Sequence, residues 1–423
     1  MLKSIILKIF IISIVIANIS EAKKYYLDAS NGNDKNSGLS SNSAWKTINK
    51  VNDFAFLKGD IIAFKKGQTF KGYTLCPNRN KLTFTTYGIG NKPIIDGEGT
   101  KLCVSWNNLN NLTFCGIEFV NGYYFNLNTD NSNYLIIDSC IFNGNQITTT
   151  NAYIGRSYYT IIRNCIFKNA RSKHGLYIGG GGYQVIEHNQ FVNNGEDGIH
   201  INVNVDPNLR VLHPIIRFNW FENNAQSYQD QATDSAEIYY NVIINDPSRW
   251  SVCMALSYEA NYFSLAARNG KVYNNTFIMY DANTSGSTGI FIYGNPFIDG
   301  WIIKNNIFYC PNSNSGYLIY QQNGGGKNFT FDNNLYFRKN GSYQWHIKGI
   351  NYNSFAAWQI AGNDIKGIQG NPMFKNILKK DYSLTKSSPC INKGQNLGLL
   401  KDYLGNLISI IPDLGAFQYK NIN

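Results

Sequence analysis

The sequence is poor in charge, because Asp, Glu, Lys and Arg together make up only 15% of its 423 residues. Long helices depend on Glu, Lys, Ala and Leu, whereas this chain is rich in Asn, Gly and Tyr, and Asn and Gly favour turns. This shortage argues against a mainly helical protein. The composition favours many short strands joined by tight corners, and 43% hydrophobic residues suffice for a large core.

The chain also lacks a long hydrophobic run beyond its N-terminus. No later segment approaches about 18 uninterrupted apolar residues, the length that a membrane-spanning helix requires. The first residues combine Lys3 and Lys8 with an apolar stretch over 9–17 and end in Ser20-Glu21-Ala22. This is the pattern of a secretory signal peptide at 1–22. We therefore expect an exported protein, secreted or periplasmic, with no membrane span.

A basic run interleaved with aromatic residues is missing as well, which argues against binding to nucleic acid. The net charge is nevertheless positive: without Lys3, Lys8 and Glu21 of the signal peptide, 36 basic and 26 acidic residues remain. A basic exported protein attracts anionic partners such as acidic polysaccharide, teichoic acid or a membrane surface. We expect a monomer with an anionic partner, and the charge alone leaves these three kinds of partner open.

The eight cysteines lack the paired spacing of a zinc site or of a small disulfide-bonded scaffold. No compact cluster of acidic residues demands calcium. The cofactor is therefore left open: nothing in the sequence supports calcium, and no residue is assigned as a metal ligand.

A repeated segment ending in an aromatic residue runs through the chain. LIIDSCIF ends at Phe142, TIIRNCIF at Phe167 and QVIEHNQF at Phe191, and the pattern continues to FTFDNNLY at Tyr336. EIYYNVI, ending at Ile243, fits with a substitution. A repeat of about 24 residues with loops of variable length is typical of a solenoid.

A column of small polar residues stands two positions before each aromatic. In a parallel β-helix equivalent side chains stack about 4.8 Å apart, so a buried column of Asn amides can hydrogen-bond along the axis. The two Cys residues would fill the same column as small side chains that tolerate burial. The column comprises Cys140, Cys165, Asn189, Asn219, Asn241, Asn275, Asn306 and Asn334.

Both ends of the chain add a resemblance to a known family. The N-terminal part contains YYLDASNGNDKNSGLSSNSAWKTINKVN and YGIGNKPIIDG, and the C-terminal part contains DYSLTKSSPCINKG and PDLGAFQY. With the repeats, these segments resemble secreted bacterial right-handed parallel β-helix proteins of the pectate-lyase-like superfamily. That resemblance implies an all-β, right-handed parallel β-helix. The superfamily includes polysaccharide lyases, glycoside hydrolases, epimerases and non-catalytic adhesins, so the fold alone leaves the activity open.

The predicted organisation follows from the repeats. Residues 23–71 form an N-terminal cap and first coil, with an amphipathic helix capped by Ser43 that presents Trp45, Ile48, Val51 and Phe54. Residues 72–351 form the coils, and 352–423 form closing coils and a tail.

The middle coils hold the densest set of ionisable residues. Strand alternation sends Tyr177 and His200 outward, and aligning the Asn223-Asn224 corner with Asn193-Asn194 places Asp230 at the position of His200. Tyr177, His200 and Asp230 would form one solvent-facing ladder. Longer loops at 204–213, 225–235 and 257–270 would lie over it. The other candidate residues are Arg171, Lys173, His174, Glu196 and Asp197.

Two reactions suit this set. In β-elimination on a uronic acid, Arg171 or Lys173 would neutralise the carboxylate, His200 would take the C5 proton and Tyr177 would protonate the leaving oxygen. The substrate would also contact His174 and Glu196. Hydrolysis would instead use a pair of carboxylates.

For hydrolysis, that pair would be Asp197 with Asp230 or Glu196. Elimination on an anionic polysaccharide is the leading hypothesis, because the chain is basic, the middle coils contain Arg, Lys, His and Tyr, and the family that the chain resembles includes polysaccharide lyases. A hydrolase on the same scaffold and a non-catalytic glycan-binding protein remain alternatives.

Overall fold

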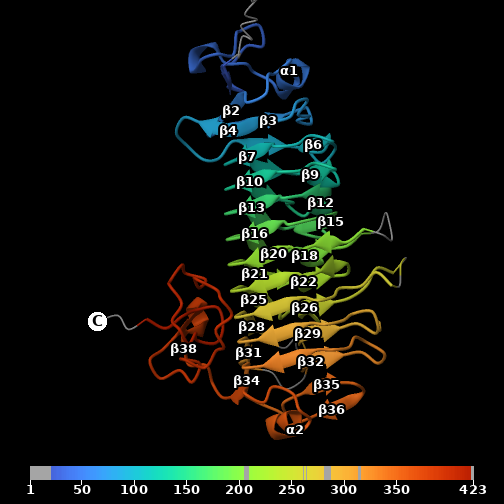
Figure 1. The fold of residues 1–423 in the computed structure, drawn as a ribbon. Coiled ribbons are helices and arrows are strands. Elements are labelled where there is room, and N and C mark those ends of the chain that lie inside the picture. The colour runs from blue at the N-terminus through green and yellow to red at the C-terminus, as the bar shows by residue number, and fades with distance from the viewer. Residues whose placement is uncertain are drawn as a thin grey trace, which may run out of the picture.

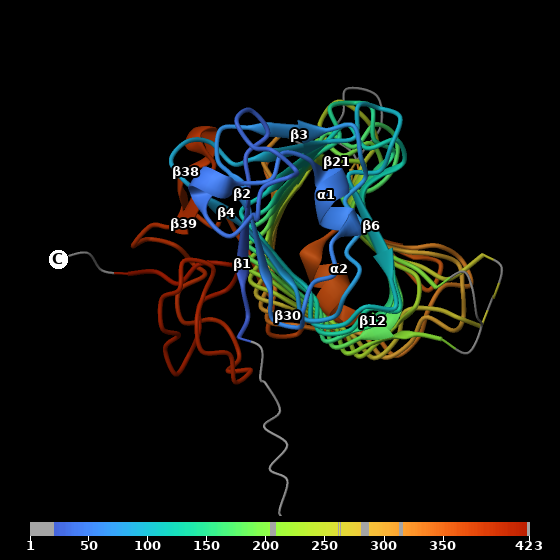
Figure 2. The same ribbon diagram turned by 90° about the horizontal axis from the view of Figure 1, so that it is seen from above.

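A computed structural model describes residues 21–203, 209–260, 262, 264–280, 287–312 and 316–420. Residues 1–20 of the expected signal peptide, and residues 204–208, 261 and 263 of the expected loops, lie outside these ranges. The described chain winds into a right-handed parallel β-helix whose coils stack along one axis, with three sheets forming its sides (Figures 1 and 2). The all-β solenoid predicted from the repeats is confirmed.

Each regular coil contributes one short strand to each sheet in turn. The first sheet consists of β1 (Lys24–Leu27), β2 (Ile61–Lys65), β4 (Thr83–Tyr87), β7 (Thr113–Cys115), β10 (Ile136–Asp138), β13 (Ile161–Arg163), β16 (Val185–Glu187), β20 (Ile215–Arg217), β24 (Glu237–Tyr239), β27 (Lys271–Tyr273), β30 (Ile302–Lys304) and β33 (Thr330–Asp332). The second sheet consists of β3 (Thr69–Lys71), β5 (Ile94–Asp96), β8 (Glu118–Val120), β11 (Ile141–Asn143), β14 (Ile166–Lys168), β17 (Gln190–Val192), β21 (Trp220–Asn224), β25 (Val242–Asn245), β28 (Thr276–Ile278), β31 (Ile307–Cys310), β34 (Leu335–Arg338) and β37 (Ile368–Gln369).

The third sheet carries the candidate site. Its strands are β6 (Val104–Asn107), β9 (Phe125–Asp130), β12 (Thr150–Tyr158), β15 (Leu176–Gly182), β18 (Asp197–Ile201), β22 (Gln226–Asp230), β26 (Val252–Leu256), β29 (Thr288–Ile292), β32 (Tyr317–Gln321), β35 (Trp345–Ile347) and β36 (Ile350–Tyr352), with β19 (Val211–Leu212) and β23 (Thr233–Asp234) beside them. Pairing is parallel except between β35 and β36, so equivalent residues of successive coils lie directly above one another.

The repeated aromatic residues form a stack in the core. The ring centroids of Phe142 and Phe167 lie 4.8 Å apart with nearly parallel planes, and Phe167 and Phe191 follow at 5.0 Å. Ile243 interrupts the stack, which resumes with Phe277 on Phe308 at 4.8 Å. Offset stacking along the axis adds to the burial of apolar surface, so each coil stabilises its neighbours.

The predicted Asn column is present and connects the coils by hydrogen bonds. The Nδ2 group of Asn275 donates to Oδ1 of Asn306 at 3.1 Å, and Nδ2 of Asn306 donates to Oδ1 of Asn334 at 3.0 Å. Asn334 in turn donates to Oδ2 of Asp364 at 2.7 Å, so a buried carboxylate ends the column. Burial raises the pKa of Asp364 to about 6, although hydrogen bonds from Asn334 and Tyr336 oppose that rise.

Cys140 and Cys165 continue the same column toward the N-terminus. The backbone N–H of Cys140 donates to Sγ of Cys165 at 3.3 Å, and that of Cys165 donates to Oδ1 of Asn189 at 2.9 Å. Both side chains are buried, and neither forms a disulfide. The two residues therefore fill the column as predicted, without a disulfide.

The N-terminal cap differs in detail from the prediction. The helix α1 (Ile48–Asp53) begins later than expected, and its N-cap is Thr47, whose side chain accepts from the N–H of Lys50. Ser43 instead ends the short 3-10 helix η1 (Ser41–Ser43). Trp45 stays outside the helix because its backbone pairs with β1, donating to the carbonyl of Tyr26 at 2.9 Å.

The C-terminal segment covers one end of the solenoid and then one side of it. The helix α2 (Phe355–Ile360) carries Trp358, which stacks on Trp345 at 5.4 Å. The chain then turns back along the outside of the second sheet (Figure 1), through β38 (Phe374–Asn376), η2 (Ile377–Lys379) and β39 (Asp381–Leu384). The N–H of Ala416 donates to Oγ1 of Thr276 at 2.9 Å, which fixes this segment against β28.

The helices in the described part of the chain are all short, and none is long and apolar enough to cross a membrane.

We predict that Asn306→Leu lowers the free energy of unfolding by about 3 kcal/mol or more, because it leaves buried partners unsatisfied on the preceding coil. The N–H and Nδ2 groups of Asn275 would lose their acceptor, and the Val272 carbonyl would lose its donor. Thermal melting measures the effect. The exposed Asn353 supplies the control, because Asn353→Leu should leave the melting temperature nearly unchanged. Equal melting of the two variants would contradict the role of the column.

Candidate active site

An outward column of the third sheet carries aromatic side chains on successive coils. Tyr153 pairs with Tyr177, and Tyr177 pairs with His200. The corresponding ring centroids lie 5.2 Å and 4.8 Å apart. The predicted alignment of Tyr177 with His200 is confirmed. In axial order the column comprises Asn128, Tyr153, Tyr177, His200, Gln229, Ala255, Phe291, Tyr320 and His346.

His200 is not the solvent-facing side chain that strand alternation predicts. Only 7% of its surface is exposed. The rings of Tyr177 and His174 stack against it, with centroids at 4.8 Å and 4.1 Å. Alternation decides on which side of a sheet a residue lies, but neighbouring side chains decide how much of it water reaches.

Asp230 does not belong to this column. Asn194 and Asn224 do align, with a hydrogen bond of 3.0 Å between their amides. The corner that follows Asn224 is one residue shorter, however, so His200 pairs with Gln229 and Asp230 pairs with Ile201. A shift of one residue turns a side chain to the opposite face of a sheet.

Asp230 is consequently fully buried inside the solenoid. Its carboxylate accepts from the hydroxyls of Thr233 at 2.6 Å and Tyr228 at 2.9 Å. Burial raises the pKa of Asp230, and these hydrogen bonds only partly oppose the rise. This position rules out a direct contact between Asp230 and a substrate on the outer face.

Asp197 instead joins the two histidines into one buried cluster. Its Oδ2 atom lies 2.6 Å from Nδ1 of His200 and 2.9 Å from Nδ1 of His174. Asp197 and His200 lie on β18, and His174 comes from the corner one coil earlier, just before β15. All three side chains are buried.

Burial and the charges within the cluster determine which of its side chains carry a proton. Burial alone would raise the pKa of Asp197, but contacts with His174 and His200 lower it below the ordinary value, so the carboxylate is ionised. For His174, burial dominates and lowers the pKa, with Asp197 opposing it, so its imidazole is neutral near pH 7.

The tautomer of His200 follows from this charge distribution. An ionised carboxylate can only accept a hydrogen bond, so Nδ1 of His200 must donate to Asp197. In the neutral imidazole the lone pair then resides on Nε2. A buried carboxylate that orients and polarises an imidazole in this way makes it suitable as a general base.

Tyr177 has the properties of a proton donor. Burial raises the pKa of its phenol above the ordinary value, and the charges of Tyr153 and Glu259 raise it further. The phenol therefore keeps its proton near neutral pH. Because its ring stacks directly on His200, the two groups present an acid and a base on one face of the sheet.

Sequence reasoning missed Glu259 and Tyr293. Glu259 is buried and close enough to influence Tyr177 electrostatically. The pKa of Tyr293 is raised by burial and then by the charges of Asp197 and Glu196, so this phenol also lies near the cluster. Tyr293 directly follows β29, at the position that Ser257 and Gln322 occupy on the neighbouring coils, so no recurring residue type marked it. The one signal for Glu259 was the longer connection after Ser257.

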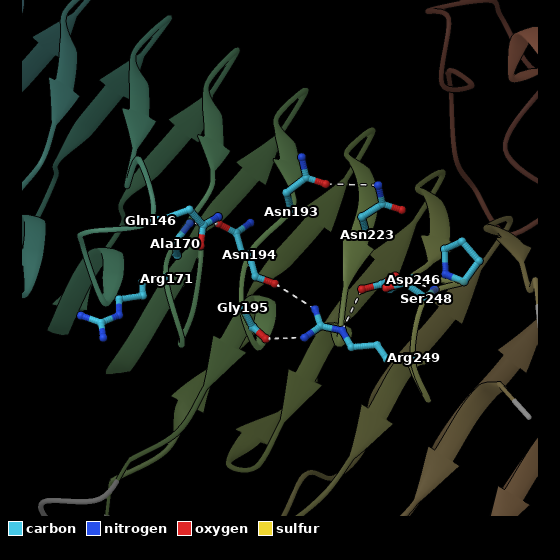
Figure 3. Close-up of a pocket in the computed structure, with 11 residues that line it drawn as sticks. Gln146, Ala170, Arg171, Asn193, Asn194, Gly195, Asn223, Asp246, Ser248 and Arg249 are labelled. Atoms are coloured by element: carbon cyan, nitrogen blue, oxygen red, sulfur yellow. Dashed lines mark hydrogen bonds and ion pairs between the residues drawn. The ribbon is translucent and has the colours of Figure 1, made fainter. Parts of the chain in front are cut away.

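The corner before the third sheet forms a polar pocket of about 490 Å³ beside the cluster (Figure 3). Arg171 lines this pocket and forms no ion pair among the described residues. Arg249 lies across it, donating to the carbonyl of Gly195 at 2.9 Å and pairing with Asp246 at 2.7 Å (Figure 3).

The remaining two predicted binding residues neutralise one another. Nζ of Lys173 lies 2.8 Å from Oε2 of Glu196, and both side chains are partly exposed. An exposed pair of this kind contributes little to stability. Arg171 is therefore the predicted cation that is available to an anionic ligand.

The cluster could also hold a metal ion. His174, Asp197 and His200 offer ligand atoms that all lie within 4.8 Å of one another, the one such group found in the described part of the chain. Two imidazoles and one carboxylate suit a transition metal such as zinc. They do not suit calcium, which requires six to eight oxygen ligands.

Known proteins resemble this chain in fold but not in sequence. No family model matches the sequence, and no curated protein matches it significantly. The pectate lyase Pel9A superposes with a TM-score of 0.60 at 15% identity, covering 95% of this chain and 97% of that one. XylC in complex with xylose gives 0.51 at 11% identity, covering 93% and 98%.

A GH136 lacto-N-biosidase from Eubacterium ramulus superposes with a TM-score of 0.48 at 13% identity over 75% of this chain. This chain spans 64% of the length of that protein. At such identities the likeness establishes the parallel β-helix fold alone.

The lowered pKa of His174 predicts that acid destabilises the fold. The unfolded imidazole takes up a proton near its ordinary pKa of 6.5, whereas the folded one resists it, so stability falls as the pH drops below about 6.5. The lowered pKa of Asp197 adds a further loss below about pH 4.

Melting temperatures across this range test the assignment. His174→Gln should weaken the loss of stability below about pH 6.5. The exposed His213 is the control, and His213→Gln should retain it. An unchanged pH dependence in His174→Gln would show that the cluster does not hold His174 neutral.

Proposed function

We propose that this protein is an exported enzyme that cleaves an anionic, uronate-containing polysaccharide by β-elimination. The observation that carries the proposal is the 2.6 Å contact between Asp197 and Nδ1 of His200, with Tyr177 stacked on His200. This arrangement combines an oriented base with a protonated acid on adjacent coils. The β-helix fold, shared with Pel9A, supports a carbohydrate substrate by analogy.

The reaction balances with these two groups. Nε2 of His200 takes the proton from C5 of the uronate. The electron pair of the broken C5–H bond then forms the C4=C5 double bond. The C4–O4 bond breaks, and the departing oxygen receives the proton of the Tyr177 phenol. Asp197 acts as a positioning residue, because it fixes the tautomer of His200 and stabilises the imidazolium that forms.

Positive charge supports the choice of an anionic substrate. The carboxylate of the uronate must be neutralised before C5 can lose a proton. Arg171 is a candidate for that role, because it lines the adjacent pocket without an acidic partner. The excess of basic residues in the mature chain would further attract a polyanion.

The position of acid and base on one face favours a syn elimination. In that geometry the C5 hydrogen and the C4 oxygen must lie on the same face of the sugar ring. D-Glucuronate and D-mannuronate fulfil this condition, whereas in D-galacturonate and L-guluronate the two lie on opposite faces. We therefore propose a substrate with D-glucuronate or D-mannuronate at the cleaved position.

Hydrolysis is the alternative. The structure argues against the pair of carboxylates, Asp197 and Asp230, that hydrolysis would use. Asp230 points into the core, and Asp197 is engaged by two histidines. Glu259 is a further carboxylate in the vicinity of Tyr177. Products distinguish the reactions, because only elimination creates a C4=C5 double bond with its ultraviolet absorbance.

We predict that His200→Gln lowers kcat by about 10² or more, because the amide cannot act as a base while it keeps much of the side-chain volume. Product absorbance measures turnover, and melting confirms folding. His213→Gln, outside the cluster, should remain fully active. Full activity of folded His200→Gln would remove His200 from the mechanism, and cleavage without absorbance would transfer the reaction to hydrolysis.

A panel of homopolymers tests the stereochemistry. Polymannuronate and a β-linked polyglucuronate should give absorbing products, whereas polygalacturonate and polyguluronate should give none at matched concentration. Cleavage restricted to the latter two would refute the syn arrangement. Wild-type protein that cleaves no glycan would refute the enzymatic proposal.

A further inference from the structure

An aromatic pocket lies farther along the same face of the third sheet. It has a volume of about 400 Å³, and Trp250, Phe291, Tyr317 and Tyr320 form most of its wall. The ring of Phe291 stands 6.1 Å from Trp250 in an edge-on arrangement and 5.1 Å from Tyr320. Thr288 and Gln322 add polar groups at the margin.

Trp250 is unusual because 44% of its surface is exposed. All seven tryptophans lie in the described ranges, and Trp250 is the one that is exposed. Its indole continues the aromatic wall formed by Phe291, Tyr317 and Tyr320, and a contiguous apolar surface of this kind marks a binding site. The corner that carries it is anchored by the preceding residue, Arg249, which pairs with Asp246 and donates to the carbonyl of Gly195.

The pocket is continuous with the candidate active site. Phe291 and Tyr320 belong to the outward column that contains Tyr177 and His200. Tyr293 bridges the two regions: its ring packs 4.7 Å from Phe291, and its phenol is influenced by the charge of Asp197.

The spacing between coils sets the distance from His200 to the aromatic pocket. Gln229 and Ala255 separate His200 from Phe291, giving three steps of about 4.8 Å each, or about 14 Å in all. Each step is close to the length of one sugar residue in an extended glycan. A chain along the solenoid axis would therefore place a ring in the pocket about three residues from the one that reacts.

We propose that this aromatic pocket is a distal subsite that binds one pyranose ring of the same polysaccharide by stacking on Trp250. This inference rests on the proposed function. The apolar face of the sugar would cover the indole, while Thr288 and Gln322 would bond to its hydroxyls. The subsite would make the enzyme prefer long chains and orient them along the axis.

The test compares oligouronates of increasing length, from trisaccharide to octasaccharide, prepared from the polymer that the wild type cleaves. Wild-type kcat/KM should rise once the chain reaches from His200 to the pocket. Trp250→Ala should lower kcat/KM by roughly tenfold on long chains and leave the trisaccharide unchanged. Trp250→Phe should restore much of the loss.

The control is Tyr73→Ala, which removes an exposed aromatic residue near the N-terminal end. Its kcat/KM should equal that of the wild type on oligouronates of every length. Equal kcat/KM for Trp250→Ala and wild type on all chains would overturn the subsite while leaving the lyase proposal intact.

Binding separates the two proposals if the wild type cleaves nothing. Calorimetry then measures whether the wild type and Trp250→Ala bind polymannuronate or polyglucuronate. Binding that Trp250→Ala loses would support the subsite in a protein without this activity. Absence of binding to both polymers by the wild type would overturn the subsite as well.

Discussion

Parallel register between coils is the constraint on which the rest of the structure depends. Each strand pairs with its equivalent one coil away, so any residue type that recurs in the repeat becomes a column. The column of buried Asn residues depends on this register. Their amides form hydrogen bonds to the coils on both sides and also donate to backbone carbonyls. A buried amide that lost this register would leave several groups unsatisfied, so the column also penalises misalignment.

The same register assembles the candidate site. His174 and Asp197 are 23 positions apart in the sequence, yet adjacent coils bring them within 2.9 Å. Tyr177 and His200 are equivalent residues of those coils, so their rings stack. Strands thus hold Tyr177, His200 and Asp197, so the geometry on which the proposed mechanism rests is already present in the fold.

Departures from regularity supply the rest of the site. The shorter corner after Asn224 withdraws Asp230 into the core and leaves Gln229 on the outer face. The connection after Ser257 brings Glu259 near Tyr177, and the corner at 246–250 brings Arg249 and Trp250 to the edge of the third sheet. A regular solenoid would present a uniform surface, and these irregular segments make one side of it chemically distinct.

The sequence by itself determined the fold, the Asn column and the alignment of Tyr177 with His200, because these follow from a repeat that parallel pairing turns into contacts. It could not determine features that break the repeat. The late start of α1 depends on the pairing of Trp45 with β1, and the position of Asp230 depends on one missing corner residue. Only the tertiary structure decided that Asp197 bridges two histidines and that Glu259 lies nearby. Those contacts join separate coils through side chains that no local pattern relates.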